Sequence, residues 1–365
     1  MEDWGCLTLS LSHLKGSLNI NLPPDFKAIW RFRNGQSLSF DNKFDSAQRC
    51  PARPQVALDA SIAHGLFGGY SFYDHFKCTR MLSLDRIEYW TMRLRHHSWL
   101  AGEEIEEEEG WVGRGPNLIV FAASYDLGKI FVLDSASSEV FIISGGRLQS
   151  ASPHGILPWF QEYAQRLHEG WYTVQDLHEG LPIATRGICL FAENGPGVSV
   201  AVTRGVQVKV STIYAAEVTR DDQHTFAYSV RFRLLPKQHQ QGDQPGGAPV
   251  SQCQLNSRHW IIRNEDGEIE DEIRGEAVIG MFPHLHEGGG EFRYQSCTRS
   301  QLKNKTIKAH SYLVKAGAMP AIQFDLGSMG GDFEFVEGSR GMATGPTFDV
   351  QCPSFSFSVQ GGFIF

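Results

Sequence analysis

The residues of this sequence whose types and spacing could do chemistry begin with a glycine-bounded turn in the second half of the chain. Arg274 precedes the run Gly275-Glu-Ala-Val-Ile-Gly280. A glycine-rich turn can bind an anion because its backbone N–H groups approach the charge without obstruction from side chains. The candidate anion-binding residues are Arg274, Gly275, Glu276 and Gly280. Ala277 stands where a dinucleotide site needs a glycine, and strands are expected on both sides. A tight β-turn or bulge is therefore the favoured interpretation.

Two other arrangements of side chains have residue types that could do chemistry. Ser257 and His259 share one face of an expected strand, but no acidic residue to orient the histidine and no oxyanion donor accompany them, so no catalytic residue is predicted. His284 and His286 could converge in an extended segment. They lack a third ligand at a recognised spacing, and a solvated loop is favoured over a metal site. The sequence therefore predicts no metal, no cofactor and no enzyme activity.

Length and composition limit the classes of protein. The 365 residues exceed one ordinary domain and fit two, and 24 Phe, 8 Trp and 10 Tyr can fill sizeable cores. A net charge of −8 argues against a general nucleic-acid-binding protein. The seven cysteines are widely spaced, which argues against a secreted disulfide scaffold and a cysteine-based zinc finger. Without a long apolar run or a secretory leader, we expect no membrane association and a cytoplasmic or nuclear location.

The first half mixes helix and strand signals, and residues 1–170 are predicted to form an α+β domain. A helix should begin at Pro23-Pro24 and end near Asn34-Gly35. Strands are expected in NLIVFAAS, KIFVLD and EVFIIS, the last two as a hairpin. A later helix should bury the face that contains Leu157, Phe160, Ala164 and Leu167.

A linker is predicted over residues 171–197, followed by a β-sandwich domain over 198–365. There the hydrophobic period switches to two, as in Val206, Val208 and Val210, which favours half-buried strands. Trp260 is expected to fill the sandwich core. The segment at about 301–326 lacks this alternation and is predicted to be an inserted loop. The acidic run 103–109 is expected to be a solvated loop.

The stretch from Cys253 to Thr298 resembles the core of the ApaG domain, an immunoglobulin- or fibronectin-III-like sandwich. The matching positions are Leu255, Ser257, Arg258, His259, Trp260, Arg274, Gly275, Glu276, Val278, Gly280, Pro283, Glu291, Phe292 and Tyr294. SMGGDFEF resembles the late Gly-Met-x-Gly strand of the same domain. The resemblance covers about residues 198–359, and it marks 301–326 as an insertion because family members join these strands by a short turn.

The first half resembles the SUKH (Smi/Knr-type) superfamily through LPPDFKAIWRFRNGQ, GLFGGYSFYDH and NLIVFAASYDLGKIFVLD. The order SUKH then ApaG resembles a group of eukaryotic F-box proteins, in which the F-box docks on a Skp-type adaptor of a ubiquitin ligase. No F-box is found in this chain. The resemblance implies a non-enzymatic protein-interaction module that recognises ubiquitination substrates, with a Skp-type adaptor as partner only if an F-box exists in the full product. The alternative is ApaG-type binding of a nucleotide polyphosphate, pyrophosphate or other small anion.

Overall fold

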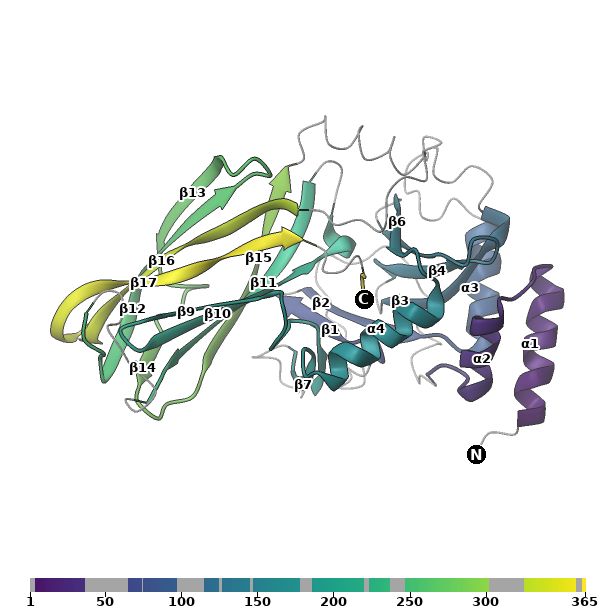
Figure 1. The fold of residues 1–365 in the computed structure, drawn as a ribbon, viewed down its shortest axis with the longest axis horizontal. Coiled ribbons are helices and arrows are strands. Elements are labelled where there is room, and N and C mark those ends of the chain that lie inside the picture. The colour runs from purple at the N-terminus through teal and green to yellow at the C-terminus, as the bar shows by residue number, and fades with distance from the viewer. Residues whose placement is uncertain are drawn as a thin grey trace.

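The computed structural model describes eleven stretches of the chain and, within them, three β-sheets. The stretches are 4–36, 65–73, 75–96, 115–124, 127–144, 147–177, 186–219, 223–236, 247–301, 325–358 and 363–365. One sheet has eight strands, a second has four, and a third has five. Figure 1 shows the eight-stranded sheet and the helices on one side of the molecule and the two smaller sheets on the other. The first group is called the N-terminal unit below and the second the sandwich.

The N-terminal unit combines helices with the eight-stranded sheet. Its helices are α1 (Trp4–Leu18), α2 (Pro24–Phe32), α3 (Leu84–His96), the 3-10 turn η3 (Gly115–Asn117) and α4 (Ile156–His168). Its strands are β1 (Gly69–Phe72), β2 (His75–Met81), β3 (Leu118–Ser124), β4 (Ile130–Asp134), β5 (Val140–Ser144), β6 (Arg147–Ser152), β7 (Thr173–Asp176) and β8 (Arg186–Cys189). The sheet order is β6-β5-β4-β3-β2-β1-β8-β7, and the β1–β8 pair is parallel.

The sandwich is built from two antiparallel sheets. Its strands are β9 (Val198–Thr203), β10 (Val206–Tyr214), β11 (Gln223–Leu234), β12 (Gln252–Arg263), β13 (Ile269–Glu276), β14 (His284–His286), β15 (Phe292–Gln301), β16 (Asp325–Ser339) and β17 (Met342–Ser358). One sheet has the order β15-β11-β10-β9. The other has the order β13-β12-β16-β17, with β14 also paired to β12. The predicted all-β second half is confirmed.

Aromatic side chains from the two sheets meet in the core of the sandwich. The ring of Phe232 on β11 lies 4.7 Å from that of Phe333 on β16, edge to face. Trp260 on β12 is 3% exposed, and its ring lies 5.8 Å from that of Tyr228 on β11. Edge-to-face pairs of this kind contribute beyond simple burial. Trp260 therefore fills the core, as its size predicts.

The helix expected after Pro23 is α2, and the turn that follows it explains its end. Gly35 has a φ of +62°, and a Cβ there would lie 2.3 Å from the carbonyl oxygen of Leu82. Trp30 on the buried face donates its indole N–H to the same carbonyl at 2.9 Å. Glycine is thus needed both for the backbone conformation and for the close approach to the next element.

The prediction that α4 buries the face with Leu157, Phe160, Ala164 and Leu167 is wrong. The buried residues are Ile156, Trp159, Tyr163 and Arg166. Leu157 is 39% exposed. The two faces have similar helical spacing, but the buried one carries side chains with polar tips that find partners. For example, the hydroxyl of Tyr163 donates to the carbonyl of Leu66 at 2.8 Å.

The interval 171–197, predicted as a linker, contains two strands of the N-terminal sheet. Strands β7 and β8 pair with each other, and β8 also pairs with β1 at Gly69↔Cys189. The short strand β7 alternates half-buried and exposed residues and is the outermost strand, so it gives little hydrophobic signal. The chain passes to the sandwich only between Cys189 and Val198.

The last residues also differ from the predicted 198–365 sandwich. Phe363–Phe365 pack on the N-terminal unit, where the carbonyl of Ile364 accepts the indole N–H of Trp159 at 2.8 Å. Residues 302–324 of the expected insertion, and the acidic run 103–109, lie outside the described residues. Strand β15 ends at Gln301 and β16 begins at Asp325, so the described residues at both ends of the expected 301–326 loop are strand residues.

A buried ion pair joins the two halves. Lys129, just before β4, lies 3.1 Å from Glu217 in the 3-10 turn η4 (Ala216–Val218) of the second half, with side chains 1% and 0% exposed. Tyr70 on β1 donates its hydroxyl to the same carboxylate at 2.6 Å. The hydroxyl of Ser144 on β5 donates to the carbonyl of Ala216 at 2.7 Å. The turn η4 is therefore bound by β1, by β5 and by the residue just before β4 of the first sheet.

A second ionic cluster surrounds Glu193, on the crossing between the two halves. Its carboxylate pairs with Arg231 on β11 and lies 3.1 Å from Lys209 on β10. Arg231 also donates to the carbonyl of Ala192 at 2.7 Å. Burial by itself raises the pKa of the Glu193 carboxyl, but Arg231 and Lys209 outweigh burial and hold it below its ordinary value. This carboxylate therefore stabilises the folded state at neutral pH, and that contribution fades as the pH falls through its lowered pKa.

The Lys129–Glu217 pair generates a stability prediction. Lys129→Met should lower the free energy of unfolding by about 3–5 kcal/mol, because it leaves a buried carboxylate without its cation. The double variant Lys129→Met/Glu217→Gln should recover part of that loss, since neither charge then remains buried. Urea denaturation of the wild type, both single variants and the double variant measures the coupling energy. Equal losses in the single and double variants would contradict the pairing.

Burial of the thiols generates a second prediction. Burial raises the pKa of Cys78 and Cys189 from 9.0 to about 11 and that of Cys253 to about 12. Each thiol stays protonated in the folded state where it would ionise in the unfolded state. The contribution of these thiols to the free energy of unfolding should therefore be fully present below pH 9 and should fall as the pH rises towards 11.

Site-resolved alkylation measured by mass spectrometry gives the complementary test. Because the thiolate is the reactive form, Cys78, Cys189 and Cys253 should react far more slowly in native protein at pH 8 than in urea. Cys297 is only partly buried and serves as the internal comparison. Native labelling of all four at the same rate would refute the assignment.

Candidate functional site

The candidate anion-binding turn lies at the end of β13, and its geometry is that of a tight β-turn. Val278 and Met281 exchange both backbone hydrogen bonds, at 3.0 and 2.8 Å. The two residues between them, Ile279 and Gly280, have φ values of +44° and +78°. Positive φ at both central residues is the requirement of a type I′ turn. Gly280 meets that requirement without strain.

The backbone donors of this turn are largely engaged within the fold. The N–H groups of Val278 and Met281 close the turn, and that of Ala277 donates to the carbonyl of Asn256 at 3.3 Å. On the other side, Arg258 donates to the carbonyls of Glu276 and Ala277 at 2.6 and 2.7 Å. The turn thus offers carbonyl oxygens to an internal cation, rather than a ring of free N–H groups to an anion.

Gly275 serves this arrangement through its missing side chain. A Cβ at Gly275 would lie 3.1–3.2 Å from the guanidinium of Arg258. The guanidinium can therefore lie over the strand and reach the two carbonyls. Ala277 has a φ of +59°, which costs a non-glycine residue roughly 1–2 kcal/mol. The hydrogen bond from Arg258 to its carbonyl offsets that cost.

Arg274 belongs to a different cluster, on the outer face of the same sheet. It donates to Glu272 at 2.9 Å, and its side chain is 69% exposed. The same Glu272 oxygen contacts Nε2 of His259 at 2.8 Å, and Nδ1 of His259 contacts Asp332 at 2.9 Å. Hydrogen bonds from Arg274 and His259 hold the pKa of the Glu272 carboxyl below its ordinary value. The cation proposed for an external anion is already paired.

Further carboxylates extend this cluster across the sheet. Register places Asp332 and Glu334 of β16 opposite Gln351 and Asp349 of β17. Burial raises the pKa of the Asp349 carboxyl, and the charges of Asp332 and Glu334 raise it further. The outer face of the β13-β12-β16-β17 sheet is therefore acidic around one imidazole.

The remaining motif positions are structural. Tyr294 is 4% exposed and stacks with Phe232, as does Phe292. Pro283 accepts the backbone N–H of Leu255 at 3.0 Å. Ser257 lies on β12 opposite Glu276 of β13 and, beyond a bulge, Glu334 of β16.

His284 and His286 lie on β14 with both side chains exposed and Leu285 buried between them. Across the described stretches, no group of three or more His, Cys, Asp or Glu side chains could hold a metal ion. No helix in the described part of the chain is long and apolar enough to cross a membrane.

The sequence did not reveal that Glu272 and Asp332 contact His259. Both lie outward on strands whose alternation is readable, but their meeting depends on register. A bulge between Leu255 and Ser257 shifts the β12–β16 pairing by one residue, and the sequence carries no sign of it.

Comparison with known proteins agrees with this fold. Residues 215–315 match the ApaG domain family, DUF525. Protein ApaG from Anaeromyxobacter dehalogenans is 39% identical over 99 residues, which cover 27% of this chain and 67% of that protein. The second half therefore contains an ApaG domain, matched over residues 215–315.

Two longer relatives extend the similarity into the N-terminal unit. F-box protein SKIP16 from Arabidopsis thaliana is 32% identical over 367 residues, which cover 94% of this chain and 71% of that protein. F-box only protein 3 from Homo sapiens is 22% identical over 305 residues, which cover 79% of this chain and 51% of that protein. The chain belongs to the family of F-box protein SKIP16. It spans about half the length of F-box only protein 3.

The two arginines generate a paired prediction. Arg258→Ala should lower the free energy of unfolding by about 1.5–3 kcal/mol, because two carbonyls lose a charged donor and Ala277 keeps its strained backbone. Arg274→Ala, its matched control on the neighbouring strand, should leave the urea midpoint nearly unchanged, since its partner Glu272 is an exposed carboxylate. Equal effects of the two substitutions would show that Arg258 does not hold the turn.

Proposed function

We propose that this protein is a non-enzymatic interaction protein that recognises substrates for an F-box-type ubiquitin ligase. The observation that carries the proposal is relatedness to F-box protein SKIP16 over 94% of the chain, which includes both halves. A domain shared only with bacterial ApaG would support the second half alone. Substrate recognition needs an ordered surface and no reacting group, which suits a site whose polar atoms are paired with one another.

In this proposal the N-terminal unit is a SUKH-type domain. Its support is the match of LPPDFKAIWRFRNGQ and the following strands to that superfamily, together with an α+β unit of helices around one sheet. The protein is proposed to act in the cytoplasm or nucleus through protein partners, with no nucleic acid or membrane involved. A Skp-type adaptor is a partner only through an F-box in the full product.

The acidic outer face of the sandwich is the surface we assign to recognition. Asp332, Glu334 and Asp349 lie on adjacent strands, and burial with mutual repulsion raises the pKa of Asp349. Approach of a basic segment would relieve that repulsion, so basic substrates are favoured. The edge strand β13 next to this face is exposed along nearly its whole length, and Ile269 and Ile273 are 54% and 38% exposed.

Affinity purification from host lysate tests the ligase assignment. The complete coding region should recover a Skp-type adaptor and cullin. A variant with Asp332→Lys and Glu334→Lys should recover the same adaptor but lose the ligase's substrates, whereas Arg274→Ala should lose neither. Failure of the complete product to recover any adaptor would overturn the ligase assignment.

Anion binding by Arg274, Gly275, Glu276 and Gly280 stays the alternative prediction, although the internal pairing of this turn gives it little support. Calorimetry with pyrophosphate and diadenosine polyphosphates tests it. Binding that Arg274→Ala abolishes would establish it. Absence of a binding heat at millimolar ligand would rule out anion binding by this turn.

A further inference from the structure

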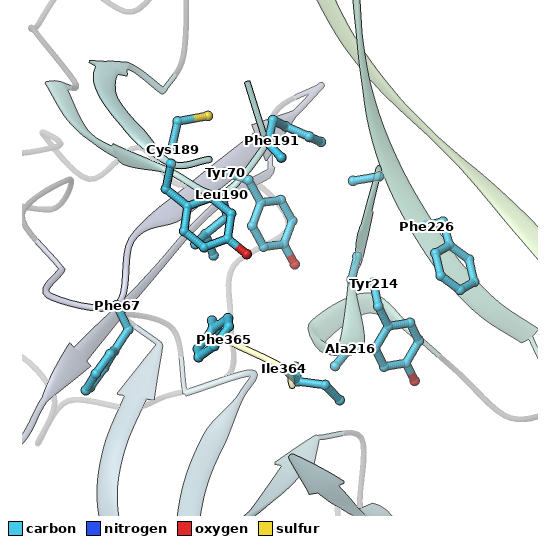
Figure 2. Close-up of a cluster of buried hydrophobic side chains, with 14 of the residues drawn as sticks. Phe67, Tyr70, Cys189, Leu190, Phe191, Tyr214, Ala216, Phe226, Ile364 and Phe365 are labelled. Atoms are coloured by element: carbon cyan, nitrogen blue, oxygen red, sulfur yellow. The ribbon is translucent and has the colours of Figure 1, made fainter. Parts of the chain in front are cut away.

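The last three residues of this sequence, Phe363-Ile364-Phe365, occupy a groove on the N-terminal unit and are called the tail below. They follow the sandwich strand β17, which ends at Ser358, yet their hydrogen bonds go to Trp159, Lys129 and Ala151 of the N-terminal unit. Figure 2 shows Phe365 on the side of Phe67 and Leu190, and Ile364 on the side of Ala216 and Tyr214. Ile364 and Phe365 are 7% and 6% exposed.

Two side chains and one backbone carbonyl of the groove bind the backbone of these residues. The indole N–H of Trp159 donates to the carbonyl of Ile364 at 2.8 Å, and the ammonium of Lys129 donates to the carbonyl of Phe365 at 2.8 Å. The N–H of Ile364 donates to the carbonyl of Ala151 at 3.3 Å. Backbone recognition at three points is how grooves hold extended peptides.

Aromatic contacts add side-chain selectivity to the backbone bonds. The ring of Phe365 lies 5.1 Å from that of Tyr163 and 5.4 Å from that of Trp159. The guanidinium of Arg166 lies over the Phe365 ring at 5.0 Å. Phe363 stacks on Phe365 with an interplanar angle of 3°. The groove therefore suits an aromatic side chain at the third position, and an aromatic side chain at the first position stacks on it, with an apolar one between them.

The groove is also connected to the buried junction. The ammonium of Lys129 contacts Glu217 at 3.1 Å and the carbonyl of Phe365 at 2.8 Å, so one cation holds η4 and the tail. Loss of the tail would remove an acceptor from a lysine that is 1% exposed. An unsatisfied buried charge of this kind weakens its other contacts.

We propose that α4, Lys129 and Ala151 form a binding site for peptides of the pattern Phe-apolar-Phe, and that the protein's own tail fills it as a strap between the two halves. The ligand class is a short extended peptide with two aromatic side chains and free backbone carbonyls. The site is separate from the acidic outer face, and it does not depend on a role in ubiquitination.

The test uses the full chain with Phe365→Ala and the peptide Gly-Gly-Phe-Ile-Phe, labelled for fluorescence anisotropy. The variant should bind the peptide saturably, and the peptide should raise its thermal midpoint. The intact chain should bind at least about tenfold more weakly, because its own tail already fills the groove. Burial of one phenyl ring changes an affinity by about that factor or more. A peptide with both phenylalanines replaced by alanine is the ligand control.

Two further variants locate the binding. Adding Trp159→Phe to the Phe365→Ala chain keeps an aromatic ring but removes the donor to Ile364, and it should weaken peptide binding severalfold. Adding Leu157→Ala, on the exposed side of α4, should leave the affinity unchanged. The site is overturned if Phe365→Ala, shown to be folded by near-ultraviolet circular dichroism, binds the peptide no better than the intact chain. If Phe365→Ala does not fold, the chain lacking residues 363–365 replaces it. Failure of the peptide to restore folding of either chain would equally overturn the proposal.

Discussion

The relation between the two halves depends on one buried ion pair, that of Lys129 and Glu217. Two charges withdrawn from water are costly unless each finds a close partner and further hydrogen bonds. Here Tyr70 donates to the carboxylate, and the carbonyl of Phe365 accepts from the ammonium. The groups come from β1, the start of β4, η4 and the end of the sequence, so the pair is satisfied only when all four are in place.

The same requirement explains why the junction is continuous with the two cores. Buried apolar residues form one cluster that runs from Leu11 in α1 to Phe365. The energy of an ion pair falls quickly when its two groups move apart, whereas hydrophobic burial is non-directional. The pair therefore restricts the orientation of the two halves, and the apolar cluster stabilises the halves in that orientation. Other polar contacts between the halves, such as Ser71 with Gln295 at 2.9 Å, add to this specificity.

Much of the architecture was predictable from local signals, because those signals are short-range. Alternation in Val206–Val210 identified β10, and the proline pair and Asn34-Gly35 bounded α2. The ApaG assignment rested on motif positions that lie close together in the chain. The prediction was wrong where two local solutions compete: α4 buries Trp159 and Tyr163 because their polar tips find partners far away in the sequence, and helical spacing cannot show this.

The candidate site was predictable only in its parts. Arg258, His259, Arg274 and Gly275 were all recognisable motif positions, yet Arg274, expected to face an anion, pairs with Glu272, and Arg258, for which no role was expected, holds the turn. Residue parity along β12 decides this: Trp260 points inward, His259 points outward, and Arg258 reaches back over Gly275 to the turn. Which carboxylate of β16 meets His259 depends on the register of that strand, set by a bulge with no local signature.

Register and junction together determine what a binding partner meets. The acidic face is presented by four strands whose order is fixed by backbone pairing, and Gly331 allows β16 to approach β12 closely, since a Cβ there would lie 2.1 Å from the carbonyl of His259. The junction then holds that face at one angle to the N-terminal unit. In the proposed role as a substrate receptor, this constancy would fix the distance between a bound substrate and the rest of a ligase, because the stiffness of a connection sets how often linked groups meet. A flexible linker over 171–197 would have left that distance free. Strands β7 and β8, the Glu193 cluster and the Lys129–Glu217 pair remove that freedom by making the crossing part of the fold.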